Sequence, residues 1–153
     1  MIRRVVHGAA IVCTIACATS VQAQQQRLTP ASVLSLPVVS AGPGTSGLKA
    51  IETRLLSGDP TKQGPYTIAI RVPPNTHIAA HTHLDARSAV VTAGVWHFGY
   101  GAVAADAAST PLPVGSFYTE PEGLAHFAWT GPEGATVFIT GIGPSDTRYV
   151  RTP

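Results

Sequence analysis

Two histidines, His81 and His83, stand two residues apart in the stretch PPNTHIAAHTHLDARSAVVTAG. The stretch has strand character, and side chains at positions i and i+2 of a strand leave the same face. Two imidazoles on one face can bind a single cation at nitrogen-to-metal distances of about 2.0 to 2.1 Å. His126, further along in GSFYTEPEGLAHFAWTG, is the candidate third ligand. The spacing therefore predicts that His81, His83 and His126 hold one metal ion.

The chemistry of the three side chains indicates a divalent transition metal. Imidazole suits several such ions, so the metal is Fe, Zn, Ni, Cu or Mn, and availability decides among them. The competing interpretation is that the three rings are buried, hydrogen-bonded core groups that bind no metal. The matching context of two separate segments favours the metal site.

Short strands must position these histidines. Residues 66–72 alternate between apolar and polar side chains, which is the period of a half-buried strand. Residues 101–113 are expected to form an Ala-rich loop, and no amphipathic helix is expected. The fold class is all-β, and a jelly roll would let two facing sheets enclose a pocket. A turn at 73–75 leads into the strand of His81 and His83. The other expected strands, mostly bounded by Gly or Pro, are 48–57, 88–92, 95–100, 115–120, 124–129, 135–142 and 148–150.

Residues 1–23 are expected to be a signal peptide, with Arg3 and Arg4 before an apolar run and cleavage after Ala23. A transmembrane anchor is the competing interpretation, but the run is shorter than the ~20 apolar residues that span a bilayer. A lipid-modified Cys17 is a minor alternative, because the residues before it lack the usual large aliphatic side chain. The mature chain is therefore expected to be periplasmic or secreted, without stable membrane insertion.

Removal of this segment changes the composition of the chain. Both cysteines leave with it, so the mature chain offers neither a disulfide nor a thiolate nucleophile. Eight basic residues then face eight acidic ones, and this balance gives no electrostatic support for nucleic-acid binding. Residues 24–47 are rich in Pro, Gly, Ser and Gln and are expected to be an extended arm, with a short extended piece at 32–40. Residues 48–153 are expected to form one barrel domain.

The two histidine segments resemble the motifs of the cupin superfamily, the small RmlC-like jelly-roll barrels that hold a metal inside. The first cupin motif is matched by His81, His83 and Gly94, with Asn75 in the place of its first glycine. The second motif is matched at the right spacing by four residues, Gly115, Pro121, Gly123 and His126, while Trp129 stands where the motif has Asn. The resemblance implies a cupin-type jelly-roll β-barrel with an N-terminal extended arm. Such folds often form homodimers, which the arm would allow.

Arg87 stands where the first cupin motif has a glutamate ligand. A bare guanidinium about 5 Å from a divalent ion would cost about 7 kcal/mol at an effective dielectric near 20. Three outcomes are open: an anion lies between Arg87 and the metal, Arg87 pairs with a carboxylate, or no metal binds. The candidate carboxylates are Asp85, Glu120 and Glu122.

The resemblance and the arginine together suggest two functions. Three-histidine cupins that are similar in this respect include thiol dioxygenases and β-diketone-cleaving dioxygenases, which implies a metal-dependent dioxygenase or isomerase acting on a small anionic or enolisable molecule. The alternative is a non-catalytic module that binds a small ligand, with or without metal. The candidate substrate-binding residues are Arg87, His77, His97, Tyr118 and Glu120.

Overall fold

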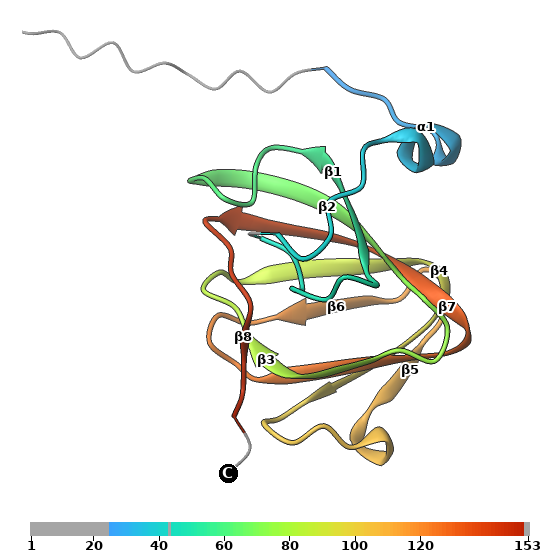
Figure 1. Ribbon diagram of the computed structural model, residues 1–153, viewed down its shortest axis with the longest axis vertical. Coiled ribbons are helices and arrows are strands. Elements are labelled where there is room, and N and C mark those ends of the chain that lie inside the picture. Colours follow the sequence, from blue (N-terminus) through green and yellow to red (C-terminus); the bar gives the residue numbers. More distant parts are fainter. Residues whose placement is uncertain (1–24, 43, 152–153) are drawn as a thin grey trace, which may run out of the picture.

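The computed structural model describes residues 25–42 and 44–151, so the expected signal peptide at 1–23 lies outside the described residues. The chain forms a β-barrel, and a short helix, α1, lies outside it (Figure 1). Within the described ranges, no helix has both the length and the apolar character needed to cross a membrane. The bounds of the elements are α1 Pro30–Ser35, β1 Glu52–Ser57, β2 Gly64–Val72, β3 His77–Thr82, β4 Arg87–Tyr100, η1 Asp106–Ala108, β5 Thr110–Leu112, β6 Phe117–Glu120, β7 His126–Gly143 and β8 Arg148–Tyr149.

Two long antiparallel strands, β4 and β7, form the spine of the barrel. They pair from Arg87 opposite Gly141 to Tyr100 opposite His126. Strand β7 also pairs with β2 and β3, while β4 also pairs with β5 and β6, so every other strand except β1 and β8 borders the spine. Strand β1 adds to β2, and β8 adds to β3 (Figure 1). The start of β7 is therefore held between β3 and the end of β4.

The apolar side of each strand faces a single core. The predicted alternation of β2 is confirmed, because Tyr66, Ile68, Ile70 and Val72 are all buried. In β4 the buried side chains include Trp96 and Phe98, which pack into the same cluster. Burial of each such side chain contributes roughly 1.5 to 3 kcal/mol. The interior is thus a packed apolar core with polar groups at one end.

Some predicted boundaries differ from the structure. Residues 88–92 and 95–100 belong to one strand, and so do 126–129 and 135–142, while residues 124–125 precede the strand. The intervening residues, 93–94 in β4 and 130–134 in β7, are accommodated by shifts in the β4–β7 register, so they do not end the strands. In the arm, residues 30–35 form α1 in place of the expected extended piece, because the Thr29 side chain accepts a hydrogen bond from the Ser32 backbone N–H and Pro30 suits the first helical turn.

Gly94 is a point of close approach between the two spine strands. Its φ of +70° is a conformation that side chains with a Cβ rarely adopt. A Cβ at this position would also collide with the carbonyl oxygen of Gly134 in β7. Glycine is therefore the residue that fits this position.

We expect Gly94→Ala to lower the free energy of unfolding by about 2 to 4 kcal/mol, because backbone strain and a steric clash add. Urea unfolding followed by circular dichroism measures this loss. Gly47→Ala is the matched control, since Gly47 has a φ of +74° but open space around its Cα. Equal losses in the two variants would show that the contact with Gly134 has no energetic role.

Candidate metal centre

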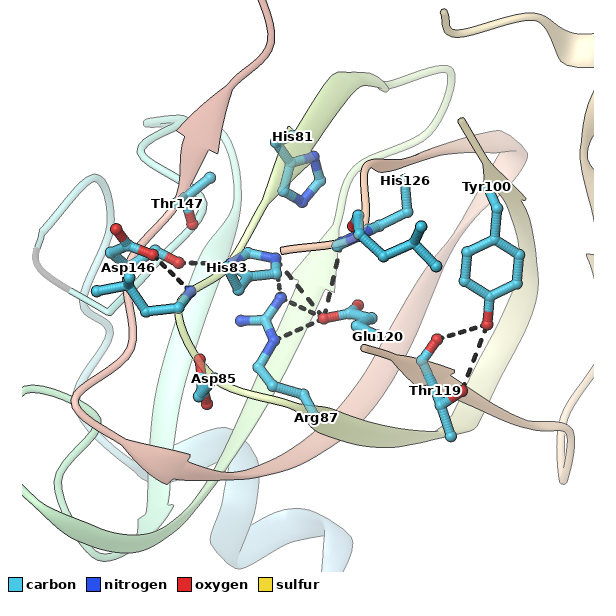
Figure 2. Close-up of polar contacts among 12 residues, drawn as sticks. His81, His83, Asp85, Arg87, Tyr100, Thr119, Glu120, His126, Asp146 and Thr147 are labelled. Carbon is cyan, nitrogen blue, oxygen red and sulfur yellow. Dashed lines mark hydrogen bonds and ion pairs between the residues drawn. The ribbon is translucent and has the colours of Figure 1, made fainter. Parts of the chain in front are cut away.

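The three predicted histidines meet at one end of the barrel interior. His81 in β3 lies directly opposite His126 in β7, and their ring centroids are 4.4 Å apart. His83 follows the end of β3, and its ring lies 4.8 Å from that of His81 and 5.0 Å from that of His126. One ligand atom from each residue lies within 4.8 Å of the others, and all three residues are buried. The expected convergence of the three histidines is therefore present (Figure 2).

Each imidazole is oriented by a backbone carbonyl. The Nδ1 of His81 lies 2.8 Å from the carbonyl oxygen of Ala79, and the Nδ1 of His126 lies 2.9 Å from that of Leu124. The Nδ1 of His83 makes the same contact with the carbonyl of Asp146. A carbonyl only accepts, so each Nδ1 carries the proton and each Nε2 keeps its lone pair. In this tautomer Nε2 is free to bind a metal while Nδ1 donates to the carbonyl that fixes the ring.

Turns on both sides of the barrel end hold these rings in place. The Gly123 backbone N–H donates to the carbonyl of His83 at 3.0 Å, which ties the turn before β7 to the end of β3. The Asp146 side chain accepts from the Leu84 backbone N–H at 2.8 Å, so the β7–β8 connection is tied to the same segment. Two loops that are distant in sequence therefore fix the position of His83.

Burial keeps the three imidazoles neutral. It lowers the pKa of His81 to about 4, with the neighbouring His126 acting in the same direction. It lowers the pKa of His83 to about 3, where the nearby Arg87 charge adds to the effect. The pKa of His126 is also lowered, again chiefly by burial. At pH 7 all three rings are therefore ready to act as neutral ligands.

Arg87 pairs with Glu120, one of the three carboxylates considered from the sequence. The two residues lie directly opposite each other on β4 and β6. The Arg87 Nε donates to Glu120 Oε2 at 2.6 Å, and Nη2 contacts both Glu120 Oε2 and His83 Nε2 (Figure 2). Glu120 Oε2 lies 3.6 Å from His83 Nε2 and 3.8 Å from His126 Nε2. A buried ion pair thus borders the histidine cluster.

The electrostatics of this pair favour its charged form. Burial alone would raise the pKa of Glu120, but Arg87, together with His126 and His83, holds it below its ordinary value. Burial alone would likewise lower the pKa of Arg87, but Glu120 and other nearby groups keep it raised. Both side chains are therefore ionised at neutral pH.

The cavity beside the histidines is small and mostly apolar. Its volume is about 30 Å³, enough for one or two water-sized molecules. Residues 44–46 and Thr147 lie at its border, and the hydroxyl of Thr147 donates to the carbonyl of Thr45 at 2.8 Å. A wider surface hollow of about 460 Å³ near Glu52 and Arg71 contains none of the histidines. The buried, converging polar groups make the small cavity the candidate site. Its apolar lining is Ile68, Ile70, Ile78, Trp96, Phe98, Ala128 and Ile139.

Two of the histidines considered as substrate contacts lie outside this cavity. His77 faces outward, because the irregular pairing of β3 between Ile78 and His81 shifts the alternation, so His77 and His81 do not share a face. The side chain of His77 is 63% exposed and lies against Trp129, with ring centroids 5.8 Å apart. His97 stacks on the same indole, with ring centroids 3.5 Å apart. Its side chain leaves β4 on the side opposite to that of the buried Trp96. Neither imidazole reaches the three-histidine cluster.

Tyr118 lies within the barrel but away from the cavity wall. It is buried against Phe98, with ring centroids 4.3 Å apart, and its hydroxyl has no hydrogen-bond partner among the described residues. Burial raises the pKa of Tyr118 well above its ordinary value, and the Glu120 carboxylate adds to the effect. Of the five substrate-contact candidates, Arg87 and Glu120 are the ones that border the histidines.

Several contributors were not identified from the sequence. The carbonyls of Ala79, Leu124 and Asp146 orient the rings, and no residue type signals a backbone acceptor. The hydrogen bond of the Tyr66 hydroxyl to the buried Asp85 carboxylate, at 2.7 Å, was also not predicted, although Asp85 itself was considered as a partner of Arg87.

Comparison with solved structures supports the fold. A polyketide cyclase, RemF from Streptomyces resistomycificus, aligns with a TM-score of 0.65 and 18% identity over 85% of this chain and 88% of that chain. An RmlC-like cupin from Shewanella frigidimarina aligns with a TM-score of 0.57 and 16% identity, covering 79% of this chain and 93% of that chain. A chain from a study of DMSP lyases aligns with a TM-score of 0.58 and 18% identity, covering 71% and 57% of the two chains.

Sequence comparison identifies the family. No curated protein matches the chain. The family model of the ChrR cupin-like domain matches residues 43–146, a range that includes all three histidines, Arg87 and Glu120. With the barrel, the jelly-roll relatives and the histidine cluster, this match places the chain in the cupin superfamily, as a member of the ChrR cupin-like domain family.

Proposed function

We propose that His81, His83 and His126 hold one divalent transition metal, and that the protein is a metal-dependent cupin. The observation that carries the proposal is the shared tautomer: every Nδ1 faces a carbonyl, so all three Nε2 atoms are left as acceptors in one small volume. The Nε2 of His126 is buried without a hydrogen-bond partner among the described residues. Burying a nitrogen lone pair without a partner costs free energy of folding, and a bound cation removes this cost because the lone pair then coordinates it.

The surroundings favour a small anionic or enolisable molecule as the substrate of a dioxygenase or isomerase. When bound, the metal would act as a Lewis acid that polarises an oxygen of the substrate. Arg87 lies next to the cluster, and its guanidinium N–H groups can donate hydrogen bonds that orient an anionic group. The apolar walls exclude water and strengthen these hydrogen bonds. The metal is Fe, Zn, Ni, Cu or Mn, since imidazole ligands accept all of these ions.

We expect the protein purified from cells to contain about one metal ion per chain, and His81→Ala to weaken binding at least about 100-fold. Loss of an outer partner of a ligand already costs 10- to 100-fold, and loss of the ligand itself costs more. Elemental analysis and competition titration with a chelator measure the two quantities. His77→Ala is the matched control, because His77 lies on the same strand but on the outer surface. Equal metal content in all three proteins would refute the site.

The size of the cavity favours a second candidate function, a metal-holding module without turnover. A volume of about 30 Å³ leaves no room for an organic substrate unless residues 44–46 move away from the border. Oxygen uptake with β-diketones, thiols and catechols, measured on the metal-loaded protein, separates the two functions. Consumption that depends on His81 supports the enzyme. Tight metal binding without consumption of any compound supports the module.

A further inference from the structure

The carboxylate of Glu120 lies where a fourth metal ligand would be. Two ligand atoms on one ion, each about 2.0 to 2.1 Å from it, are roughly 2.9 to 3.4 Å apart in octahedral or tetrahedral geometry. The Glu120 Oε2 is already 3.6 Å from His83 Nε2 and 3.8 Å from His126 Nε2. A shift of less than about 1 Å would therefore bring this oxygen into the coordination shell of an ion bound by the histidines.

Arg87 occupies part of the same position. Its Nη2 donates toward the lone pair of His83 Nε2 and also contacts Glu120 Oε2. His83 Nε2 has a single lone pair, so it cannot accept from Arg87 and bind an ion at the same time. Ion binding therefore requires Nη2 of Arg87 to leave His83. If the whole guanidinium moves, its separate Nε hydrogen bond to Glu120 also breaks, and the carboxylate is released.

A second buried carboxylate can receive the displaced guanidinium. Asp85 Oδ1 is buried and has no hydrogen-bond partner among the described residues, while its Oδ2 accepts from Tyr66. The Asp85 carboxylate lies against Gly141, which is the residue opposite Arg87 in β7. Arg87 therefore has two carboxylates near it, Glu120, with which it pairs, and Asp85 (Figure 2).

We infer that Glu120 is the fourth, anionic ligand of the metal, and that Arg87 is a built-in cation that occupies the site until the metal displaces it toward Asp85. This inference rests on the proposed three-histidine site. It assigns the carboxylate ligand to β6, directly across the ladder from the arginine on β4. One negative ligand then offsets part of the charge of the ion, while the pair of Arg87 and Asp85 stays neutral.

Titration with Co²⁺ tests the assignment, because it reports affinity and the ligand set together, the latter through the visible absorption spectrum and X-ray absorption. We expect Arg87→Met to bind Co²⁺ at least as tightly as wild type, since the competitor is gone. Glu120→Gln should bind Co²⁺ about 100-fold or more weakly than wild type. Its spectra should indicate that the protein supplies one oxygen ligand fewer. Glu122→Gln is the matched control, because Glu122 is exposed in the neighbouring turn.

In Glu120→Gln, weaker Co²⁺ binding could come from loss of the ligand or from repulsion of the ion by the unpaired Arg87. The double variant Arg87→Met/Glu120→Gln separates these two causes. It also leaves neither member of the pair buried as a lone charge, so folding is not endangered. Binding at least tenfold weaker than in Arg87→Met supports the inference. Binding equal to that of Arg87→Met overturns it, as does an unchanged spectrum in Glu120→Gln. In either case, Co²⁺ binding that still depends on His81 would leave the proposed function intact, and wild type that binds no Co²⁺ would refute both.

Discussion

Acidifying the metal-free protein from pH 7 to pH 4.5 is expected to lower its free energy of unfolding by something on the order of 5 kcal/mol. The unfolded chain protonates its histidines near pH 6.5, whereas folding lowers the pKa of His81 to about 4 and that of His83 to about 3. Each tenfold difference in proton affinity between the two states is worth about 1.4 kcal/mol. Since the folded pKa values are depressed, the stability is fully present above pH 6.5 and is lost progressively as the pH falls toward them.

The pH range in which the histidines lose their contribution to stability lies above the range in which Glu120 loses its own. The pKa of Glu120 is held below its ordinary value of 4.5, so its own contribution is lost only at lower pH. Urea unfolding at closely spaced pH values measures the slope. His81→Phe should flatten it, while His77→Gln, altered on the outer surface, should not. A wild-type stability that is constant between pH 6.5 and 4.5 would contradict the neutral, buried state of the cluster.

Glu120→Leu is expected to destabilise the metal-free protein by about 3 to 5 kcal/mol. The substitution removes the carboxylate that pairs with Arg87 in the metal-free protein, and an arginine cannot discharge itself by losing its proton. Arg87→Met should cost less, because the remaining carboxylate can take up a proton and become neutral. Chemical unfolding at pH 7 compares the two variants.

The double variant Arg87→Met/Glu120→Leu is the control for this asymmetry. Replacing both members of a buried ion pair by apolar side chains of similar volume is often neutral or stabilising. We therefore expect its stability to be within about 2 kcal/mol of wild type. A single Glu120→Leu variant that loses less than about 1 kcal/mol would show that Arg87 reaches solvent or another acceptor easily.

The sequence by itself determined the fold class and the three histidines of the candidate metal centre. Alternating side chains define which face of a strand is buried, and this local period placed Tyr66 and Ile68 in the core. The His81–His83 spacing and the turn before His126 are equally local, because each depends on residues within a few positions. They were enough to predict that three imidazoles converge.

Tertiary structure decided what surrounds those imidazoles. Which residue lies opposite Arg87 depends on strand register, so Glu120 could be considered as its partner but not selected over Asp85 or Glu122. The orientation of His77 depended on an irregularity in the pairing of β3 with β7, which no local pattern reveals. Register and bulges arise from contacts between segments distant in the chain. The identity of the three converging histidines was thus local information, and the charged residues around them were not.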